Sequence, residues 1–175
     1  RKVQHLCRTI DDDLRWLVAL VSDTGMRLAE GAGLLKSDII LSADIPHISL
    51  KPHPWRPLKT SGSQRDIPLV GASLWAAQRL SESFSDTPYA FPRYNRRDTT
   101  NSNSASAALN KWLHQYVPVG CTMHSFRHSM RDRLRAVECP SDVIDQIGGW
   151  ATEGVGQGYG EGYQLGVCYK WLIML

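Results

Sequence analysis

Residues 124–159 combine the side-chain types that phosphate chemistry requires. The stretch opens on His-Ser-Phe-Arg-His at residues 124–128, passes Trp150 and ends at Tyr159. His124 and Arg127 are three positions apart, so a helix would place both on one face. A guanidinium and an indole N–H donate hydrogen bonds to phosphate oxygens, and a phenol is a nucleophile. The stretch therefore predicts a phosphoryl-transfer site that needs no metal.

A second arginine stands near the start of a predicted helix. Gly25 interrupts one helical pattern, and Arg27 and Glu30 follow it three positions apart. As a plain surface ion pair they would stabilise the helix by about 0.3–0.5 kcal/mol. The functional alternative is an arginine held at the top of the helix to meet a phosphate.

Apolar periodicity predicts that the elements carrying these residues are mostly helices. Leu14, Leu17, Val18 and Val21 recur at helical spacing behind three aspartates, which suit a helix start. Thr9 or Asp11 is the expected cap. The predicted helices open at residues 9–13 and after Gly25, and others cover 71–82, 102–116, 123–137, 140–147 and 163–175.

A β region separates the second predicted helix from the third. Three strands are expected at Ile45–Leu50, Trp55–Lys59 and Arg65–Leu69, with a turn at residues 60–63. Prolines flank the middle strand and favour an edge position for it. Lys59 would then sit at a hairpin tip, where a lone lysine is usually a solubilising edge charge.

Composition is typical of one globular domain. The chain has 175 residues, 42% of them hydrophobic and 21% charged. No apolar run reaches the length of a membrane span, and no secretory signal pattern opens the sequence. Four scattered cysteines without a Cys-x-x-Cys motif favour reduced thiols and a cytoplasmic location.

Basic side chains are segregated, although the net charge is only +3. They form three clusters: Lys51, Arg56, Lys59 and Arg65; Arg93, Arg96 and Arg97; and Arg127, Arg131, Arg133 and Arg135. Each cluster alone is usually a solvated surface. Three together can form a one-sided positive face, which a phosphate backbone requires.

The motifs occur in an order that resembles the catalytic domain of the tyrosine recombinases, the phage integrase family. The similarity runs from about Asp11 to Leu175. Each motif alone is weak, but the five in order, with fitting gaps, are specific. They are Thr24-Gly25-Met26-Arg27-Leu28-Ala29-Glu30; Leu58-Lys59-Thr60 with Arg65-Asp66-Ile67-Pro68-Leu69; His124-Ser125-Phe126-Arg127-His128; Gly149-Trp150; and Tyr159.

The resemblance implies an α+β fold, mainly helical with a small three-stranded antiparallel sheet at one edge. It also implies DNA strand cleavage and rejoining through a covalent 3′-phosphotyrosine on Tyr159. Arg27 and Arg127 would stabilise the transition state, each by about 3–4 kcal/mol. Lys59 would protonate the leaving 5′ oxygen, and His124 would move the tyrosine proton. Trp150 would donate a hydrogen bond from its indole N–H. Glu30 would orient His124 or an arginine from behind. His128 would likewise support the site without contacting the substrate.

Two features depart from the family pattern. Trp150 occupies a position where histidine is commoner. Glycines alternate with other residues around Tyr159 and weaken a helix by about 1 kcal/mol each. Tyr163, four residues on, is therefore a rival nucleophile, although spacing favours Tyr159.

Other functions remain as alternatives. A degenerate relative would bind DNA without cutting it, and a type IB topoisomerase-like enzyme would relax DNA by the same chemistry. A zinc site built from Cys121, His124, His128 and Cys139 lacks further support, and position 125 is not the glutamate of a metalloprotease helix. We therefore expect neither a metal nor a cofactor.

The expected partner is double-stranded DNA, with no membrane association. The residues expected on phosphates are Lys51, Arg56, Arg65, Arg96, Arg97 and Arg131. By resemblance, residues 1–175 are one catalytic domain that lacks an upstream DNA-clamping domain and forms a tetramer on DNA, with a monomer possible when free. Residues 163–175 would close their own core or dock on a neighbouring protomer.

Overall fold

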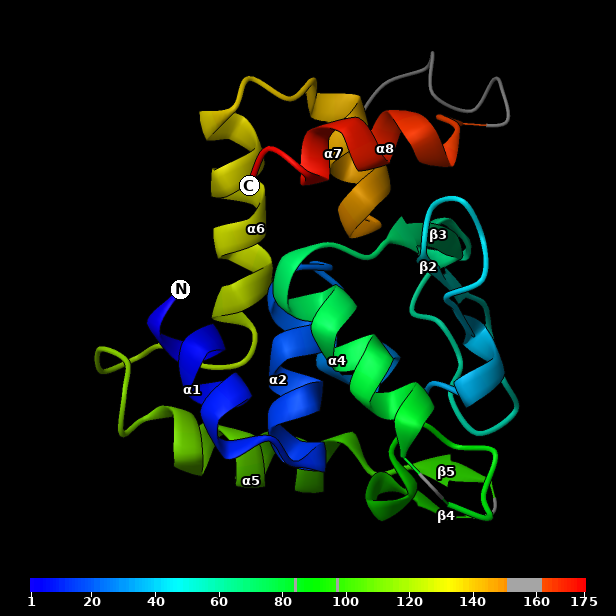
Figure 1. Ribbon diagram of the computed structural model, residues 1–175, viewed down its shortest axis with the longest axis vertical. Coiled ribbons are helices and arrows are strands. Elements are labelled where there is room, and N and C mark those ends of the chain that lie inside the picture. Colours follow the sequence, from blue (N-terminus) through cyan, green and yellow to red (C-terminus); the bar gives the residue numbers. More distant parts are fainter. Residues whose placement is uncertain (84, 97, 151–161) are drawn as a thin grey trace.

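The computed structural model describes residues 1–83, 85–96, 98–150 and 162–175 (Figure 1). Its described part is mainly helical and carries a small antiparallel sheet at one edge, as expected for the α+β class. The α-helices are α1 (Lys2–Ile10), α2 (Asp13–Ser22), α3 (Leu28–Ala32), α4 (Gly71–Glu82), α5 (Ser102–Leu113), α6 (Ser125–Ala136), α7 (Ser141–Gly148) and α8 (Leu165–Leu172). Short 3₁₀ helices are η1 (Lys36–Asp38), η2 (Ser61–Ser63) and η3 (Pro92–Tyr94).

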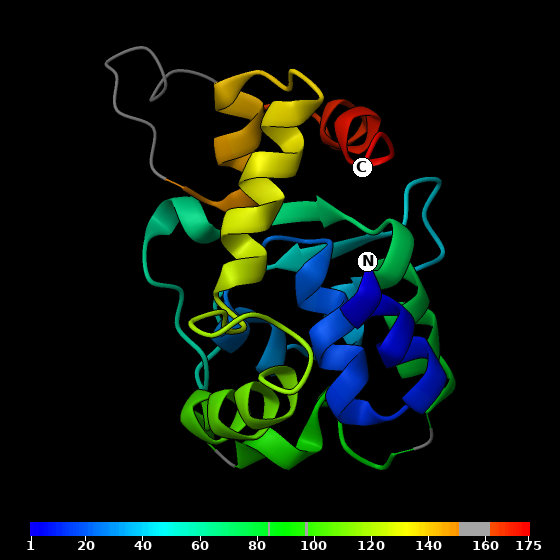
Figure 2. The same cartoon turned by 90° about the vertical axis from the view of Figure 1, so that its left-hand side faces the viewer.

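Helix α2 runs through the middle of the larger core. Every residue from Leu17 to Ser22 is buried, because α1, α3, α4 and α6 all contact this helix. Short buried side chains on α4, including Ala76 and Ala77, let that helix approach α2 closely. Figure 2 shows α6 standing beside α2, with α7 and α8 gathered at its far end.

The start of α2 differs from the predicted helix start. Thr9 and Ile10 end α1, and Asp11 follows in the left-handed region with φ 52°. Asp12 is the cap, since its side chain accepts a hydrogen bond from the Arg15 backbone N–H at 3.0 Å. Helix α1 buries only Val3 and Cys7, too few residues for a visible helical repeat.

The sheet has three antiparallel strands in the order β1 (Ile39–Ile40), β2 (His47–Leu50) and β3 (Arg65–Pro68). The register pairs His47 with Pro68 and Leu50 with Arg65. Two of the three predicted strands are therefore confirmed. The third strand is β1 and not Trp55–Lys59.

Residues 51–64 form the β2–β3 connection in place of the predicted middle strand. His53 and Arg56 exchange backbone hydrogen bonds of 3.1 and 3.0 Å, which closes a tight turn, and η2 follows. Pro54 and Pro57 lack the N–H groups that a strand donates. The local chain therefore folds back on itself instead of extending.

A second, two-stranded sheet lies in the segment between α4 and α5, where the sequence analysis expects no strand. Its strands, β4 (Asn95–Arg96) and β5 (Thr99–Thr100), pair antiparallel. Two residues per strand are too few to show an alternating pattern in the sequence.

The C-terminal helices build a second, smaller core. Met130 and Leu134 of α6, Ile144 and Ile147 of α7, and Leu172 of α8 are all buried in it. Helix α8 also contacts β3, so the C-terminal run closes a core of its own chain. The two termini lie close together, since Arg1 Nη2 donates to the Leu175 carbonyl at 3.2 Å.

Within the described ranges, no helix is both long and apolar enough to cross a membrane.

Candidate active site at the meeting of α3, α6 and α7

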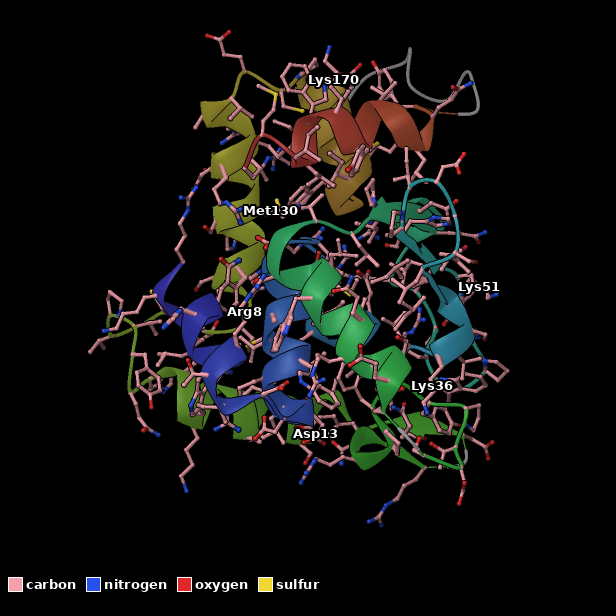
Figure 3. The ribbon with its side chains drawn as sticks, viewed as in Figure 1. Arg8, Asp13, Lys36, Lys51, Met130 and Lys170 are labelled. Carbon is pink, nitrogen blue, oxygen red and sulfur yellow. The ribbon has the colours of Figure 1, made fainter. Side chains whose placement is uncertain are left out.

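Gly25 forms the turn that places Arg27 at the start of α3. Its φ of +63° lies in the left-handed region, and a Cβ there would come within 3.1 Å of Met130 Cγ. Figure 3 labels Met130 on α6. The turn ends with Arg27 as the N-cap of α3, and the Arg27 backbone N–H donates to Glu30 Oε2 at 2.9 Å. The glycine thus lets α6 approach while the chain turns into α3.

Glu30 is the buried carboxylate of the site. It is 3% exposed, and Arg27 Nη1 and Arg65 Nη2 donate to it at 2.7 and 3.2 Å. Burial acts to raise the pKa of Glu30, but the Arg65 charge and the Arg27 hydrogen bonds outweigh it and hold the pKa below its ordinary range. The carboxylate stays ionised and fixes two guanidinium groups, while no contact to His124 is seen among its described partners.

Arg127 extends from α6 into a cage of backbone carbonyls. Its Nη1 donates to the carbonyls of Gly25, at 2.5 Å, and Gly148, and its Nη2 donates to Gly149 at 3.3 Å. Burial, aided by the charges of Arg27 and Arg65, lowers the pKa of Arg127 to about 10. The guanidinium therefore remains charged at neutral pH.

Trp150 covers this guanidinium. Arg127 Cζ lies 4.3 Å from the centre of the indole ring, and Arg131 Cζ lies 5.2 Å from it. The ring also lies against Gly148, where a Cβ would fall 1.7 Å from a ring carbon. Gly149 ends α7 with φ +63°, which turns the chain so that Trp150 folds back over α7. The structure places the face of the indole on Arg127, a contact that sequence spacing does not predict.

His124 stands exposed at the start of α6, immediately before its first turn. Its ring makes an edge-on contact with His128 at a centroid distance of 4.8 Å. Partial burial, followed by the charges of His128, Arg127 and Arg27, lowers the pKa of His124 below its ordinary value. His124 is therefore neutral at pH 7 and able to accept a proton.

Lys59 is exposed in the β2–β3 connection, four residues before the buried Ser63. Ser63 Oγ lies 2.9 Å from Thr60 Oγ1 and accepts a hydrogen bond from Arg27 Nη1 at 3.1 Å. The chain segment that carries Lys59 is thus joined directly to Arg27. Ser63 is a site residue that sequence reasoning missed, because a serine in a polar turn carries no distinguishing signal.

Tyr159, the expected nucleophile, lies outside the described residues. Tyr163 is described, and its hydroxyl donates to Asp142 in the first turn of α7. That bond is the main reason why the pKa of Tyr163 is raised. Gly148, beside Arg127, is at the other end of α7, about 9 Å away at 1.5 Å per residue. The Tyr163 hydroxyl is therefore held at the opposite end of α7 from Gly148 and Arg127.

Five of the six residues expected on DNA phosphates are described, and they differ in exposure. Lys51 and Arg96 are exposed, and Arg131 is half-buried beside Asp145 at 3.1 Å. Figure 3 shows Lys51 at the outer side of the sheet. Arg97 lies outside the described residues.

Arg56 and Arg65 are buried, which departs from the expectation of a surface contact. They are 3% and 8% exposed. Arg65 donates to the carbonyls of Ile147 and Ser63 and to Glu30, so it links β3, α7 and α3. Its periodic place on the inward face of β3 explains the burial, since Ile67 two residues on is fully buried too.

The rival zinc set is not brought together. Cys139 follows the far end of α6, about 18 Å along a twelve-residue helix from His124, and is buried in the second core. No group of three potential ligands gathers anywhere in the described ranges.

The charged groups of this arrangement carry a net positive charge, which favours binding of an anion. The guanidinium groups of Arg27, Arg65, Arg127 and Arg131 gather around two buried carboxylates in the described region, Glu30 and Asp145. An excess of fixed positive charge beside a neutral histidine suits a phosphodiester and the extra charge that develops on its oxygens during displacement.

Solved structures share this fold. The Tn1549 transposon integrase, in complex with circular intermediate DNA, superimposes with a TM-score of 0.60 at 15% identity over 90% of this chain and 60% of that one. XerA recombinase gives a TM-score of 0.60 at 18% identity, over 86% of this chain and 52% of that one. The chain thus spans a little over half the length of these structures. No curated protein sequence matches it.

The architecture is therefore that of a tyrosine recombinase catalytic domain. The model of the phage integrase family matches residues 2–161, nearly the whole sequence. The chain belongs to the phage integrase family.

Proposed function

We propose that this protein cuts and rejoins DNA strands at specific sites as a tyrosine recombinase. Tyr159 attacks the scissile phosphorus and forms a phosphotyrosine with the 3′ side of the break. The bond to the 5′ oxygen breaks, and that oxygen leaves with a proton from Lys59. Attack by a 5′ hydroxyl on the phosphotyrosine reverses the step and rejoins the strand, so no outside energy source is needed.

The observation that carries this proposal is the convergence of Arg27 and Arg127 at the turn around Gly25. Arg127 donates to the Gly25 carbonyl at 2.5 Å, and Arg27 is two residues further along. Glu30 and Ser63 hold Arg27 at 2.7 and 3.1 Å, so both guanidinium groups are fixed before any substrate arrives. Preorganised donors of this kind stabilise transition-state charge without reorganising.

Each remaining side chain has a role that fits its surroundings. His124, whose pKa is lowered, accepts the phenol proton of Tyr159. Trp150 holds the Arg127 guanidinium plane by stacking at 4.3 Å and adds its indole N–H as a donor. Glu30 orients Arg27, and His128 supports the His124 ring. The chemistry needs neither a metal nor a cofactor.

The substrate is double-stranded DNA. Lys51, Arg96 and Arg131 supply phosphate contacts around the site, together with Arg97 of the undescribed positions. The protein acts as a homotetramer on DNA, with the C-terminal run free to exchange from its own core to a neighbour.

A nicked suicide DNA substrate tests the proposal. Cleavage releases a short fragment that carries the 5′ hydroxyl, and without that hydroxyl the covalent intermediate cannot be religated and accumulates. We expect a protein–DNA adduct that survives denaturation and disappears in Tyr159→Phe. Tyr163→Phe is the matched control, since its hydroxyl is occupied by Asp142, and it should form the adduct normally.

Three results would contradict this proposal. A chain that binds DNA but forms no adduct would be a binding module. Loss of the adduct in Tyr163→Phe, with Tyr159→Phe active, would move the nucleophile. Relaxation of supercoiled DNA without recombination between two sites would instead identify a topoisomerase-like activity.

A further inference from the structure

We propose that a buried aspartate–histidine pair, Asp38 and His53, positions the loop that carries Lys59 and thereby controls protonation of the leaving 5′ oxygen. The inference rests on the proposed strand cleavage and adds positioning residues to it. Neither residue belongs to the recombinase motifs in the sequence.

Asp38 is a fully buried carboxylate at the end of η1. Its Oδ2 accepts hydrogen bonds from the Leu35 backbone N–H at 2.9 Å and from His53 Nε2 at 2.7 Å. The other oxygen, Oδ1, lies 3.6 Å from Lys51 Nζ. Because burying a charge is costly unless it is paired, Asp38 holds its partners strongly.

His53 opens the tight turn at the beginning of the β2–β3 connection. Its side chain is 8% exposed and its ring stacks on Trp55 with a centroid distance of 4.6 Å and an interplanar angle of 8°. The backbone of His53 exchanges two hydrogen bonds with Arg56. The Asp38 contact therefore fixes the whole turn and not a single side chain.

Trp55 connects this turn to the helix that presents Arg27. Its indole N–H donates at 3.1 Å to the carbonyl of Gly33, which is the C-cap of α3. Arg27 is the N-cap of the same five-residue helix. The turn and the first arginine of the site are thus attached to one short rigid element.

The far end of the connection is fixed as well. Thr60 and Ser63 are joined through their hydroxyls at 2.9 Å and through a backbone hydrogen bond of 3.0 Å. Ser63 accepts from Arg27 Nη1, and its carbonyl accepts from Arg65 Nη1 at 2.6 Å.

Lys59 therefore lies on a short segment between two anchors. Only three residues, 57–59, separate the first anchor from the second, and they span at most about 10 Å. Pro57 restricts the backbone further, and Leu58 packs against the core. With both ends fixed, the backbone at Lys59 has little freedom, so its ammonium group samples a smaller volume. Loss of the contact between Asp38 and His53 would release the first anchor and let the Lys59 ammonium group sample a larger volume.

The decisive test compares two leaving groups. In an ordinary nicked DNA substrate, the departing 5′ alkoxide needs a proton. If a sulfur replaces that bridging oxygen, the departing thiolate, whose conjugate acid has a pKa of about 8.5, leaves without an acid. A defect that comes only from a misplaced Lys59 disappears with the sulfur substrate.

We expect His53→Phe, which keeps an aromatic ring on Trp55 but loses the donor to Asp38, to slow adduct formation on the oxygen substrate by about 10²-fold. On the sulfur substrate it should cleave within about threefold of wild type, as Lys59→Ala should, because the acid is no longer used. His47→Phe is the matched control. That histidine is on β2, its Nδ1 lies 2.8 Å from the Ile45 carbonyl, and the variant should be unchanged on both substrates.

Equal slowing of His53→Phe on both substrates would overturn the inference, as would an unchanged rate on the oxygen substrate. If that variant does not fold, Trp55→Phe carries the same comparison, since it keeps the stack but loses the donation to Gly33. Wild-type protein that forms no adduct with either substrate would overturn the proposed cleavage itself, and this inference with it.

Discussion

Glu30 shows how one buried side chain organises the residues around it. Its carboxylate is shared between the half-buried Arg27 and the buried Arg65, whose side chain is 4% exposed. The spacing of Arg27 and Glu30 predicts an ion pair between them, but nothing in the sequence connects Glu30 to Arg65. Burial makes this carboxylate necessary, because without it the Arg65 charge would have no counter-charge among its described contacts.

Glu30→Gln should therefore lower the free energy of unfolding by about 3–5 kcal/mol, since it leaves a buried guanidinium without its counter-charge. Urea denaturation followed by circular dichroism would measure this. Glu82→Gln is the control, because Glu82 pairs with Arg79 on the surface, where solvent screens the charges and the loss should leave stability nearly unchanged. Equal effects of the two changes would contradict the role of Glu30.

The same carboxylate predicts a pH dependence of stability. The pKa of Glu30 is lowered in the folded state, so the group stabilises the fold above the pKa of the unfolded chain, about 4.5. This stabilisation is lost as pH falls through the lower, folded-state pKa. Wild type should lose stability more steeply than Glu30→Gln on acidification below pH 4.5, measured by thermal melting from pH 7 to pH 3.

His124 predicts a pH dependence of cleavage. Its pKa is lowered, so the neutral, proton-accepting form predominates at pH 6.5 and above. The rate of adduct formation should be level above that pH and fall below it, where the ring becomes protonated. His124→Gln should be slow and should lack this acidic limb. An acidic limb that persists in the variant would assign the titration to another group.

At the scale of elements, the turn between α7 and Trp150 holds the Arg127 guanidinium group in place. Gly148 and Gly149 supply two carbonyls to Arg127, and Gly149 adopts φ +63°. The sequence indicated a helix end here, because glycines commonly terminate helices. It did not indicate that the carbonyls would accept hydrogen bonds from Arg127.

Gly148→Ala tests how tightly this turn is packed. A Cβ at Gly148 would collide with the Trp150 ring, so the ring must move off Arg127, at a cost of about 1–3 kcal/mol. We expect a lower melting temperature and slower adduct formation. Gly166→Ala is the control at an exposed position of α8, where, among the described residues, a Cβ meets only Ile45 Cδ1 at 3.9 Å. Alanine there should stabilise the fold by about 0.4–1 kcal/mol.

Over the whole molecule, the positive groups serve two different purposes. Arg65 is buried and holds β3, α7 and α3 together, whereas Arg96 remains exposed on β4. Arg93 is also exposed but is engaged by Asp13 at 2.9 Å. Charge clusters in the sequence do not distinguish these cases, because burial and pairing depend on contacts between distant segments.

Salt dependence of DNA binding tests this division. Arg96→Ala should reduce the slope of log affinity against log salt concentration by about 0.9, the contribution of one phosphate contact. Arg93→Ala should leave the slope unchanged, since its charge is already paired with Asp13. Fluorescence anisotropy with a labelled duplex between low and moderate salt would measure both. The reverse order of effects would place the DNA on another face.

The amino-acid sequence by itself determined the fold class, most helices, two strands of the sheet and the family, because periodicity and motif spacing are local properties of the chain. It also brought Arg27, Lys59, His124, Arg127, Trp150 and Tyr159 together as one hypothesis. Only the tertiary structure decided that Trp150 stacks on Arg127, that Arg65 is internal, and that Ser63 joins the lysine loop to Arg27. Each of these depends on segments tens of residues apart, whose contacts are set by how the helices and the sheet pack together and not by any local pattern.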